Sequence, residues 1–255
     1  MAIVTLLTDF GMQDSYVAEM KGAILSRAPQ VSIVDITHLV PPGDIRAAQY
    51  LLSRAWSHFP LGTVHVAVVD PGVGTERRVL AATRTGQHFL APDNGLLSFL
   101  DAGAHFVQVP VPPGAAATFH GRDVFAPAAV ALVTGAPLDA LGTTITQPVR
   151  APLPLPRRVG AIVLGEIIYV DHFGTLISNL PAASVPWNAR IRVAGADAGP
   201  LRRTFADVPR GELVAFVGSG GMIEVAVRDG SAAERLAVGV AASVTVGETT
   251  VQDGR

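Results

Sequence analysis

Apolar and polar positions alternate along the first half of the chain in a pattern typical of short buried strands. Three apolar runs, Ile3–Thr8, Val31–Ile36 and Val64–Val69, predict strands, and the last of them is expected to be buried. Shorter runs at Arg78–Ala82 and Phe106–Val109 predict two more strands. The polar and glycine-containing stretches between these runs are long enough to hold helices or turns.

Three segments between these strands have the spacing of a helix with one apolar face. Asp14–Ala28 and Asp44–Ser57 repeat apolar side chains about every four residues, and Val124–Leu132 predicts a third helix. Strands that alternate with helices favour βαβ units. We therefore expect an α/β N-terminal domain with a mainly parallel sheet flanked by helices.

The pattern changes at Gln147–Pro156, where four of ten residues are proline. Such a segment cannot form a regular element and predicts a stiff linker. The apolar runs beyond it are separated by Gly, Pro and Asn, and they lie at Ala161–Val170, Ala189–Val193, Leu213–Val217, Met222–Val227 and Ser243–Val246. We expect an α/β domain over residues 1–148, a linker over 149–159 and a smaller all-β, barrel-like domain over 160–255.

Composition narrows the class of protein. The chain has 255 residues, of which 49% are hydrophobic and 16% charged, so it has enough apolar material for a well-buried core. The net charge of −2 and the lack of a basic cluster argue against a nucleic-acid partner. The absence of cysteine excludes disulfides and zinc–thiolate sites.

The hydropathy pattern also bears on location and assembly. No apolar run reaches the roughly 20 residues that span a bilayer, so we expect no membrane association. The first residues run directly into a predicted strand without a basic region, and we expect a cytoplasmic protein. With so few charged residues, part of the apolar surface is expected to be covered in an oligomer.

Two carboxylates follow predicted strands of the first domain. Asp9 ends the first strand, and Asp70 ends the run Val64–Val69 and opens a Pro/Gly turn that brings Arg77 back toward it. Parallel sheets bind ligands beyond the carboxyl ends of their strands, where a carboxylate can accept both hydroxyls of a ribose. For either residue alone, a cap on the following helix or turn is the simpler explanation, but two carboxylates at the same sheet edge favour a functional role.

The remaining candidates in the first domain lie in turns. His120 precedes a predicted helix, and Gly121 leaves space beside it, so this histidine has the most site-like surroundings of the seven, followed by His38. Asn94 belongs to Ala91–Gly95, which is first of all a turn signal, and its side chain could also contact a ligand. A metal held by Asp and His is conceivable here, but the spacing does not require one.

In the second domain, two motifs stand between predicted strands. The segment Asp171–Thr175 follows one strand, and Gly218–Gly221 precedes another, where three glycines around Ser219 would allow backbone to approach a ligand closely. Neither segment is a P-loop or a dinucleotide-binding fingerprint. A simple glycine-rich hairpin is an equally good explanation of the second.

Taken in order, these motifs resemble one family. Those that carry the resemblance are Thr8–Gly11, Asp70–Arg77, Ala91–Gly95, Thr118–Asp123, Asp171 with Phe173-Gly174, and Gly218 through Ala226. The set is similar to the S-adenosyl-L-methionine (SAM) hydroxide adenosyltransferases, the hydrolytic relatives of fluorinase and chlorinase. The resemblance implies in-line attack of water at C5′ of SAM to give adenosine and L-methionine, without metal or cofactor.

The same resemblance implies a homotrimer, with each active site between the first domain of one subunit and the second domain of its neighbour. It assigns the water to Asp70, Arg77 and His120, and the ribose diol to Asp9. The remaining substrate contacts that it implies are Asp14 and Tyr16 near the methionine end, Asn94 and Gly121, Phe173 against adenine, Asp171, Thr175, Ser219 and Glu224 as polar groups, and Val227 through its backbone.

Specific side chains separate hydrolysis from halogenation. Asp70 and Val73 stand where the halogenating relatives carry tyrosine and threonine, and His120-Gly121 stands where they carry tyrosine-serine. Thr175 departs from the asparagine usual in the family. Two other functions are kept open, a metal-dependent hydrolase and a non-catalytic module that binds adenosine or SAM. Whether His120 or Asp70 accepts the proton of water also stays open.

Overall fold

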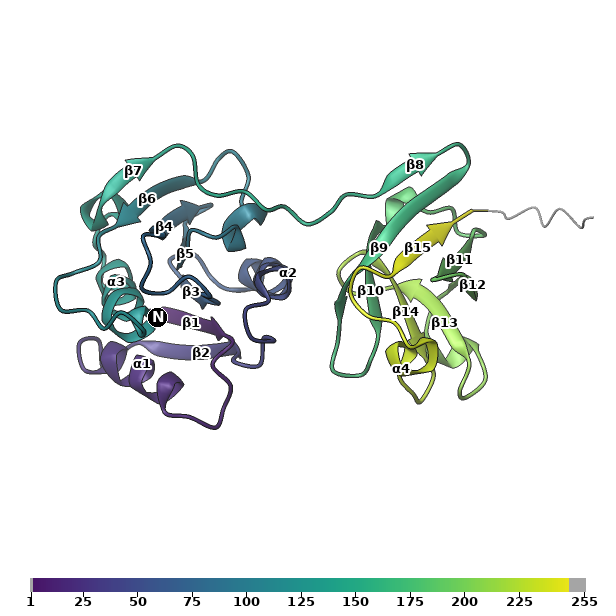
Figure 1. The fold of residues 1–255 in the computed structure, drawn as a ribbon, viewed down its shortest axis with the longest axis horizontal. Helices are drawn as coiled ribbons and strands as arrows, with labels where there is room; N and C mark the ends of the chain where they lie inside the picture. Colours follow the sequence, from purple (N-terminus) through teal and green to yellow (C-terminus); the bar gives the residue numbers. More distant parts are fainter. Residues whose placement is uncertain (1, 248–255) are drawn as a thin grey trace, which may run out of the picture. The chain divides into compact units, whose positions relative to one another are not determined.

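The computed structural model describes residues 2–247. The chain divides into two compact units, residues 1–152 and 153–255, and the boundary falls within the proline-rich segment. Each unit has a hydrophobic core of its own. Figure 1 shows the first unit built around a sheet with helices beside it, and the second built almost entirely of strands.

The first unit contains a seven-stranded sheet with the order β2-β1-β3-β5-β4-β6-β7. Its strands are β1 (Ile3–Thr8), β2 (Ser32–Thr37), β3 (Val64–Val68), β4 (Val79–Arg84), β5 (Gln87–Pro92), β6 (His105–Val109) and β7 (Thr143–Ile145). Its helices are α1 (Tyr16–Leu25), α2 (Ile45–Ala55) and α3 (Ala126–Val133), with short helical turns η1 (Trp56–His58), η2 (Leu96–Phe99), η3 (Gly121–Phe125) and η4 (Leu138–Leu141).

The sheet is mixed, which corrects the prediction of a mainly parallel one. β2, β1, β3 and β5 are parallel neighbours, whereas β4, β6 and β7 pair antiparallel. The reason lies in the two residues between β4 and β5. Thr85 and Gly86 both have positive φ, which is the backbone of the tight turn that joins adjacent antiparallel strands. That turn makes β4 and β5 a hairpin instead of a crossover pair.

Alternate residues of the central strands face the two sides of the sheet. Val4 and Leu6 of β1 belong to the same core as Met20 of α1 and Ala129 of α3, so these two helices cover one face. α2 contacts β1 and β2, and Figure 1 shows it across the sheet from α1 and α3. With both faces covered, the loops after β1 and β3 at one edge of the sheet are where polar side chains can gather.

The second unit is a closed barrel. β10, β14, β13, β12, β11, β15 and β9 pair in that order, and β9 also pairs with β10, which closes the ring, while β8 extends it beside β9. The strands are β8 (Arg157–Val159), β9 (Ile162–Val170), β10 (Leu176–Pro181), β11 (Arg190–Val193), β12 (Ala196–Arg202), β13 (Leu213–Val217), β14 (Met222–Val227) and β15 (Ser243–Val246). Helix α4 (Ala232–Leu236) and the turns η5 (Ala182–Ser184) and η6 (Phe205–Asp207) complete it.

The third predicted helix begins later than its apolar pattern indicates. The chain from Gly121 to Phe125 forms a wide π-type turn, and α3 starts at Ala126. Pro127 lies in the first turn of α3 and has no N–H to donate to a carbonyl one turn earlier. The Ala126 N–H reaches back five residues to the Gly121 carbonyl instead. Such turns occur frequently at functional sites.

Candidate active site

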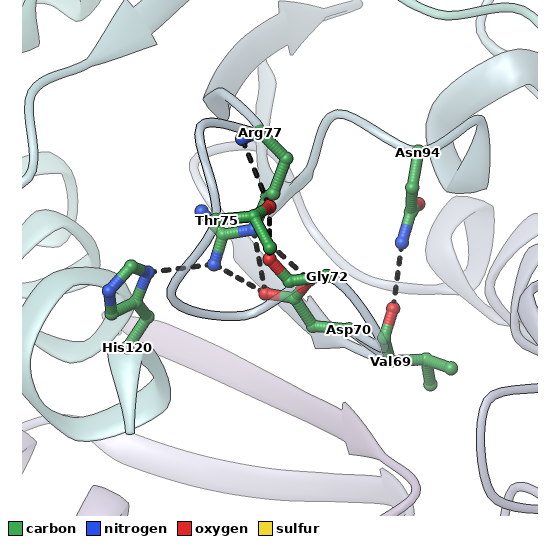
Figure 2. Close-up of polar contacts among 7 residues, drawn as sticks. All are labelled: Val69, Asp70, Gly72, Thr75, Arg77, Asn94 and His120. Carbon is green, nitrogen blue, oxygen red and sulfur yellow. Dashed lines mark hydrogen bonds and ion pairs between the residues drawn. The ribbon is translucent and has the colours of Figure 1, made fainter. Parts of the chain in front are cut away.

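Asp70, Arg77 and His120 converge although they come from two distant parts of the chain (Figure 2). The Arg77 Nε lies 3.0 and 2.9 Å from the two carboxylate oxygens of Asp70, and Arg77 Nη2 also donates to Asp70 Oδ2. The same Nη2 lies 2.8 Å from Nδ1 of His120. The side chains of Asp70 and Arg77 are 5% and 10% exposed, so a single guanidinium joins both groups in a largely desolvated place.

The backbone around Asp70 is fixed from two sides. Asn94 Nδ2 donates to the Val69 carbonyl at 2.9 Å, immediately before Asp70 (Figure 2), and Asn94 Oδ1 accepts from the Leu96 N–H. In the turn itself, Thr75 Oγ1 donates to the Gly72 carbonyl at 2.7 Å. The amide of Asn94 therefore holds the end of β3 in place, whatever further contact it makes.

Gly74 lets this turn lie against the segment before His120. Its φ is +78°, and a Cβ built there would lie 2.5 Å from the Ala117 carbonyl oxygen. A side chain at this position would be strained in its backbone and would also push the two segments apart. The contact between the Asp70–Arg77 turn and the His120 segment therefore depends on glycine.

The bond to Arg77 determines which nitrogen of His120 carries the proton. A guanidinium has donors only, so Nδ1 of His120 accepts, and a neutral imidazole must then carry its proton on Nε2. Burial lowers the pKa of His120 below its usual range, and the charge of Arg77 lowers it further. At neutral pH the side chain is an uncharged imidazole whose Nε2 is a hydrogen-bond donor.

The turn that carries His120 is tied to its surroundings by its charged neighbours. Asp123 accepts the Ala116 N–H at 2.9 Å, and Arg122 contacts Asp123 as well as Glu19 of α1. Arg122 also lies over the ring of Phe119, 5.0 Å from its centre. These contacts fix the His120 turn against α1 without using His120 itself.

A small cavity of about 60 Å³ lies beside these groups. Of the sequence-predicted residues, Asp9, Asp70, His120 and Gly121 line it, together with Phe10, Val68, Val73, Thr118 and Phe119. Arg77 lies behind Asp70 and is absent from the lining. The Asp9 carboxylate accepts the Gly43 N–H at 2.8 Å. The cavity therefore combines two carboxylates and an imidazole with apolar walls.

Asp14 and Tyr16 lie outside that lining. Both are exposed. Tyr16 is 47% exposed and packs edge-on against Phe10 and Phe119, with ring centres 6.0 and 5.3 Å away. Sequence reasoning missed these two phenylalanines as cavity residues. Their positions in the sequence could have indicated them, because Phe10 follows Asp9 and Phe119 precedes His120, and both of these candidates were expected at the same site.

The second unit has a much larger cavity, of about 720 Å³. Five sequence-predicted residues line it, Asp171, Phe173, Thr175, Glu224 and Val227, joined by Phe205, Ala226, Asp229 and Gly230. Phe173 is 75% exposed and Phe205 45%, so two aromatic side chains border it without being buried in the barrel core. Ser219 lies in the exposed hairpin turn between β13 and β14 and is not part of this lining.

The loop that presents Phe173 is organised by Asp171. Its Oδ1 accepts the N–H groups of Phe173 and Thr175 at 2.9 and 2.8 Å, which closes a tight loop. Gly174 completes the loop at φ +79°, and a Cβ there would overlap Ser231. The Phe173 ring thus projects from a rigid loop. Sequence reasoning missed Phe205, which no glycine or carboxylate motif marks.

No group of three or more His, Cys, Asp or Glu side chains in residues 2–247 is arranged to hold a metal ion. Within that same range, no helix is long and apolar enough to cross a membrane.

Comparison with known proteins covers both units. The model of the SAM hydroxide adenosyltransferase N-terminal domain matches residues 4–142, and that of the C-terminal domain matches residues 165–245. The chain is 44% identical over 247 residues to a protein of Thermus thermophilus named (R)-S-adenosyl-L-methionine hydrolase, with 91% of this chain and 94% of that protein covered. A protein of the same name from Salinispora arenicola is 41% identical, with 92% and 94% covered.

A solved structure is also similar. An uncharacterised conserved protein from Thermotoga maritima superposes with a TM-score of 0.90 at 33% identity, covering 96% of this chain and 100% of that one. The likeness therefore extends over both units.

Proposed function

This chain belongs to the SAM hydroxide adenosyltransferase family, and we infer that it hydrolyses SAM to adenosine and L-methionine. Because its relatives are named for the (R) epimer, we propose that the substrate is SAM with the (R) configuration at sulfur. The observation that carries the proposal is the contact chain from Asp70 through Arg77 to His120 beside a cavity that Asp9 also lines.

The difficulty of this reaction lies in the nucleophile. The sulfonium leaves readily with the electron pair of the C5′–S bond, whereas water has a pKa of about 15.7 and supplies little hydroxide at neutral pH. In our proposal, the water that attacks C5′ is held in the small cavity, which Asp70 and His120 both line. As the C5′–O bond forms, the water must lose one proton.

Of Asp70 and His120, the tautomer makes His120 the group that donates a hydrogen bond to the attacking water. Its Nδ1 accepts from Arg77, so the proton on Nε2 can hydrogen-bond to the oxygen that becomes hydroxide. We therefore propose that Asp70 accepts the proton of water, late in the reaction and then passes it to solvent. Arg77 stays protonated throughout and keeps the carboxylate and the imidazole in register.

Positioning contributes most to the rate in this proposal. The attraction between Asp70 and the sulfonium is strongest in the ground state and fades as the cation is neutralised, so it does not accelerate the step. Alignment of water, C5′ and sulfur can contribute ~7–11 kcal/mol. The rigid turn at Gly72–Thr75 and the clamp from Asn94 are features that serve alignment.

The lining of the small cavity supports water rather than a halide ion as the nucleophile. Its polar groups near the reacting position are a carboxylate and a neutral imidazole, and Val73 contributes only apolar surface. A carboxylate repels a halide ion, whereas it accepts a hydrogen bond from water. We propose that chloride neither reacts nor inhibits at concentrations near those of the cell.

The unequal cavities support a site shared between subunits. A space of about 60 Å³ is far too small for a nucleoside, whereas the cavity of about 720 Å³ on the barrel lies in the range of small-ligand sites. We propose that adenine packs on Phe173 of one subunit while C5′ faces Asp70 of its neighbour, in a homotrimer. Asp9 would bind the ribose diol, and Asp14 and Tyr16 would lie near the methionine end.

The direct test is incubation of purified protein with (R)-SAM and, separately, (S)-SAM, followed by chromatography for adenosine and methionine. The reactions are repeated with excess chelator and with chloride. We expect both products from the (R) epimer in equal amounts, with no loss under chelation and no chlorinated nucleoside. Tight SAM binding without methionine release would identify a binding module, and loss under chelation would identify a metal-dependent hydrolase.

A mixing experiment tests the shared site. Asp70→Ala removes the proposed catalytic group from the first unit of its chain, and Phe173→Ala removes the proposed adenine contact from the second unit. Each variant alone is therefore expected to be nearly inactive. In oligomers refolded from both variants, the intact first unit of one chain would meet the intact second unit of the other. Recovered activity supports a site between subunits, and activity that stays at the level of the separate variants would overturn it.

A further inference from the structure

His38 is buried at the end of β2, and the reaction described above makes no use of it. The residue is 3% exposed. Its Nδ1 lies 2.9 Å from Oγ1 of Thr8, and its Nε2 lies 3.1 Å from Oδ1 of Asp35. The other oxygen of Asp35 lies 2.6 Å from Nζ of Lys21. Burying an imidazole is costly unless both nitrogens are engaged, so this arrangement calls for an explanation.

The segment that His38 contacts is the one that carries Asp9. Thr8 Oγ1 accepts the Phe10 N–H at 3.2 Å, and the Gly11 N–H donates to the His38 carbonyl at 2.8 Å. Beyond Asp9, the Gly43 N–H donates to Asp9 Oδ2 at 2.8 Å. The chain from Thr8 to Gly11 is therefore fastened to residues 38–43 by both side chains and backbone.

An irregularity in the pairing of β1 with β2 brings His38 to this position. Leu6 pairs with Asp35, but Leu7 pairs with Thr37, so Ile36 is an additional residue in β2. Without it, Thr37 would come opposite Thr8 in place of His38. Bulges of this kind re-aim side chains next to active sites.

The charge of Asp35 decides the direction of the hydrogen bonds between His38, Thr8 and Phe10. Nε2 of His38 lies near the Asp35 carboxylate but outside hydrogen-bond geometry, and the negative charge there favours a proton on that nitrogen. With that proton on Nε2, Nδ1 accepts the Thr8 hydroxyl, while the oxygen of Thr8 accepts the Phe10 N–H. The Thr8 hydroxyl is thus used as donor and as acceptor, which fixes both its rotamer and the backbone that leads out of Asp9.

We infer that His38 is a positioning residue that sets the orientation of the Asp9 carboxylate for the ribose diol. It is absent from the lining of the small cavity, so it acts through Thr8 and not by touching substrate. The inference rests on the proposed function, in which Asp9 binds the diol. It adds a specificity element that lies behind the site, made of His38, Thr8 and Asp35.

The test compares two pairs of variants that differ by one polar group. Thr8→Val removes the hydroxyl at nearly constant volume, and Thr8→Ser keeps it. His38→Ala removes both contacts, and His38→Asn keeps a polar group near the Nδ1 position. We expect Thr8→Val and His38→Ala to raise KM for SAM and Kd for adenosine about tenfold with kcat within about threefold. The serine and asparagine variants are expected to stay near the wild type.

A second arm separates this inference from the role of Asp9. Binding of adenosine is compared with binding of 2′,3′-dideoxyadenosine, which lacks the diol. The wild type should prefer adenosine, and Asp9→Ala should abolish the preference. Thr8→Val and His38→Ala should reduce it, with most of their loss absent for the dideoxy ligand.

The possible outcomes are distinguishable. If Asp9→Ala leaves the preference intact, the proposed role of Asp9 fails, whatever His38 does. If Asp9→Ala abolishes it but Thr8→Val leaves it unchanged, the inference about His38 is wrong. Should His38→Ala fail to fold, as judged by its thermal unfolding curve, the two Thr8 variants decide the question by themselves. Equal losses for Thr8→Val and Thr8→Ser would also overturn the inference.

Discussion

Arg77→Lys should disable the site while leaving a positive charge in place. The guanidinium contacts Asp70 through both Nε and Nη2, and the same Nη2 donates to His120. A lysine ammonium is a single point on a flexible stem and cannot follow that fork. We expect the ammonium to keep one contact with Asp70 and to lose His120.

The magnitude follows from burial. The Asp70 and Arg77 side chains are 5% and 10% exposed, so little water is available to replace a lost bond. A hydrogen bond to a charged group contributes about 1.5–3 kcal/mol, which corresponds to a loss of roughly 10- to 150-fold in kcat/KM. Because the bond to His120 sets the tautomer that our proposal requires for turnover, we expect the loss mainly in kcat.

The assay is the steady-state rate of adenosine formation from SAM, and the adjacent arginine is the matched control. Arg78 binds the buried Asp93 through Nε at 2.6 Å and the Gln147 carbonyl through Nη2 at 2.8 Å, away from the cavity. Arg78→Lys should lower the unfolding midpoint and leave kcat nearly unchanged. If Arg77→Lys keeps kcat within threefold of the wild type, or both variants lose kcat equally, the fork is not what aligns the site.

Four further predictions concern single residues. His120→Gln keeps a donor near the Nε2 position and should retain at least tenfold more kcat than His120→Asn, whose amide reaches only the Nδ1 position; equal rates would contradict the donor role. Activity should fall with decreasing pH only below about 6.5, because the pKa of His120 is lowered and the neutral imidazole is the active form in our proposal. The dependence of kcat/KM on pH measures this. Burial lowers the pKa of His65 to about 4, so between this pH and about 6.5 the unfolded chain binds a proton that the folded chain does not. The free energy of unfolding, measured by urea titration, should therefore drop by up to about 3 kcal/mol as the pH falls from about 6.5 to about 4. A free energy of unfolding that does not change over this range would contradict the prediction. Gly74→Ala should cost activity and about 1–3 kcal/mol of stability, because its Cβ would meet Ala117, whereas Gly114→Ala has similar φ but open space and should cost less and spare kcat.

The elements predicted from periodicity are those whose apolar faces are continuous. β1, β3, α1 and α2 lie where the spacing indicates, since each buries a regular stripe of side chains. The strands that were missed are short or interrupted. β5 contains Gln87, whose side chain is buried through its bond to His65, so local hydropathy does not mark it as a core strand.

The placement of the candidate site residues was predictable to the extent that it follows strand ends and glycine turns. The positions of Asp70 and Asp9 follow from β3 and β1. The contact of Arg77 with His120 joins residues 43 positions apart and depends on how two loops pack, which no local pattern contains. His38 was ranked behind His120 because the bulge that turns it toward Thr8 leaves no mark in the apolar pattern.

The forked guanidinium of Arg77 makes the three side chains of the candidate site depend on one another. Because one cation serves both Asp70 and His120, losing it affects two partners at once, and losing either partner leaves a buried donor without its acceptor. Paired substitutions should therefore be strongly non-additive, with the second change costing little after the first. A change to another nucleophile by single substitutions would therefore pass through variants of low activity, because Asp70, Arg77 and His120 depend on one another.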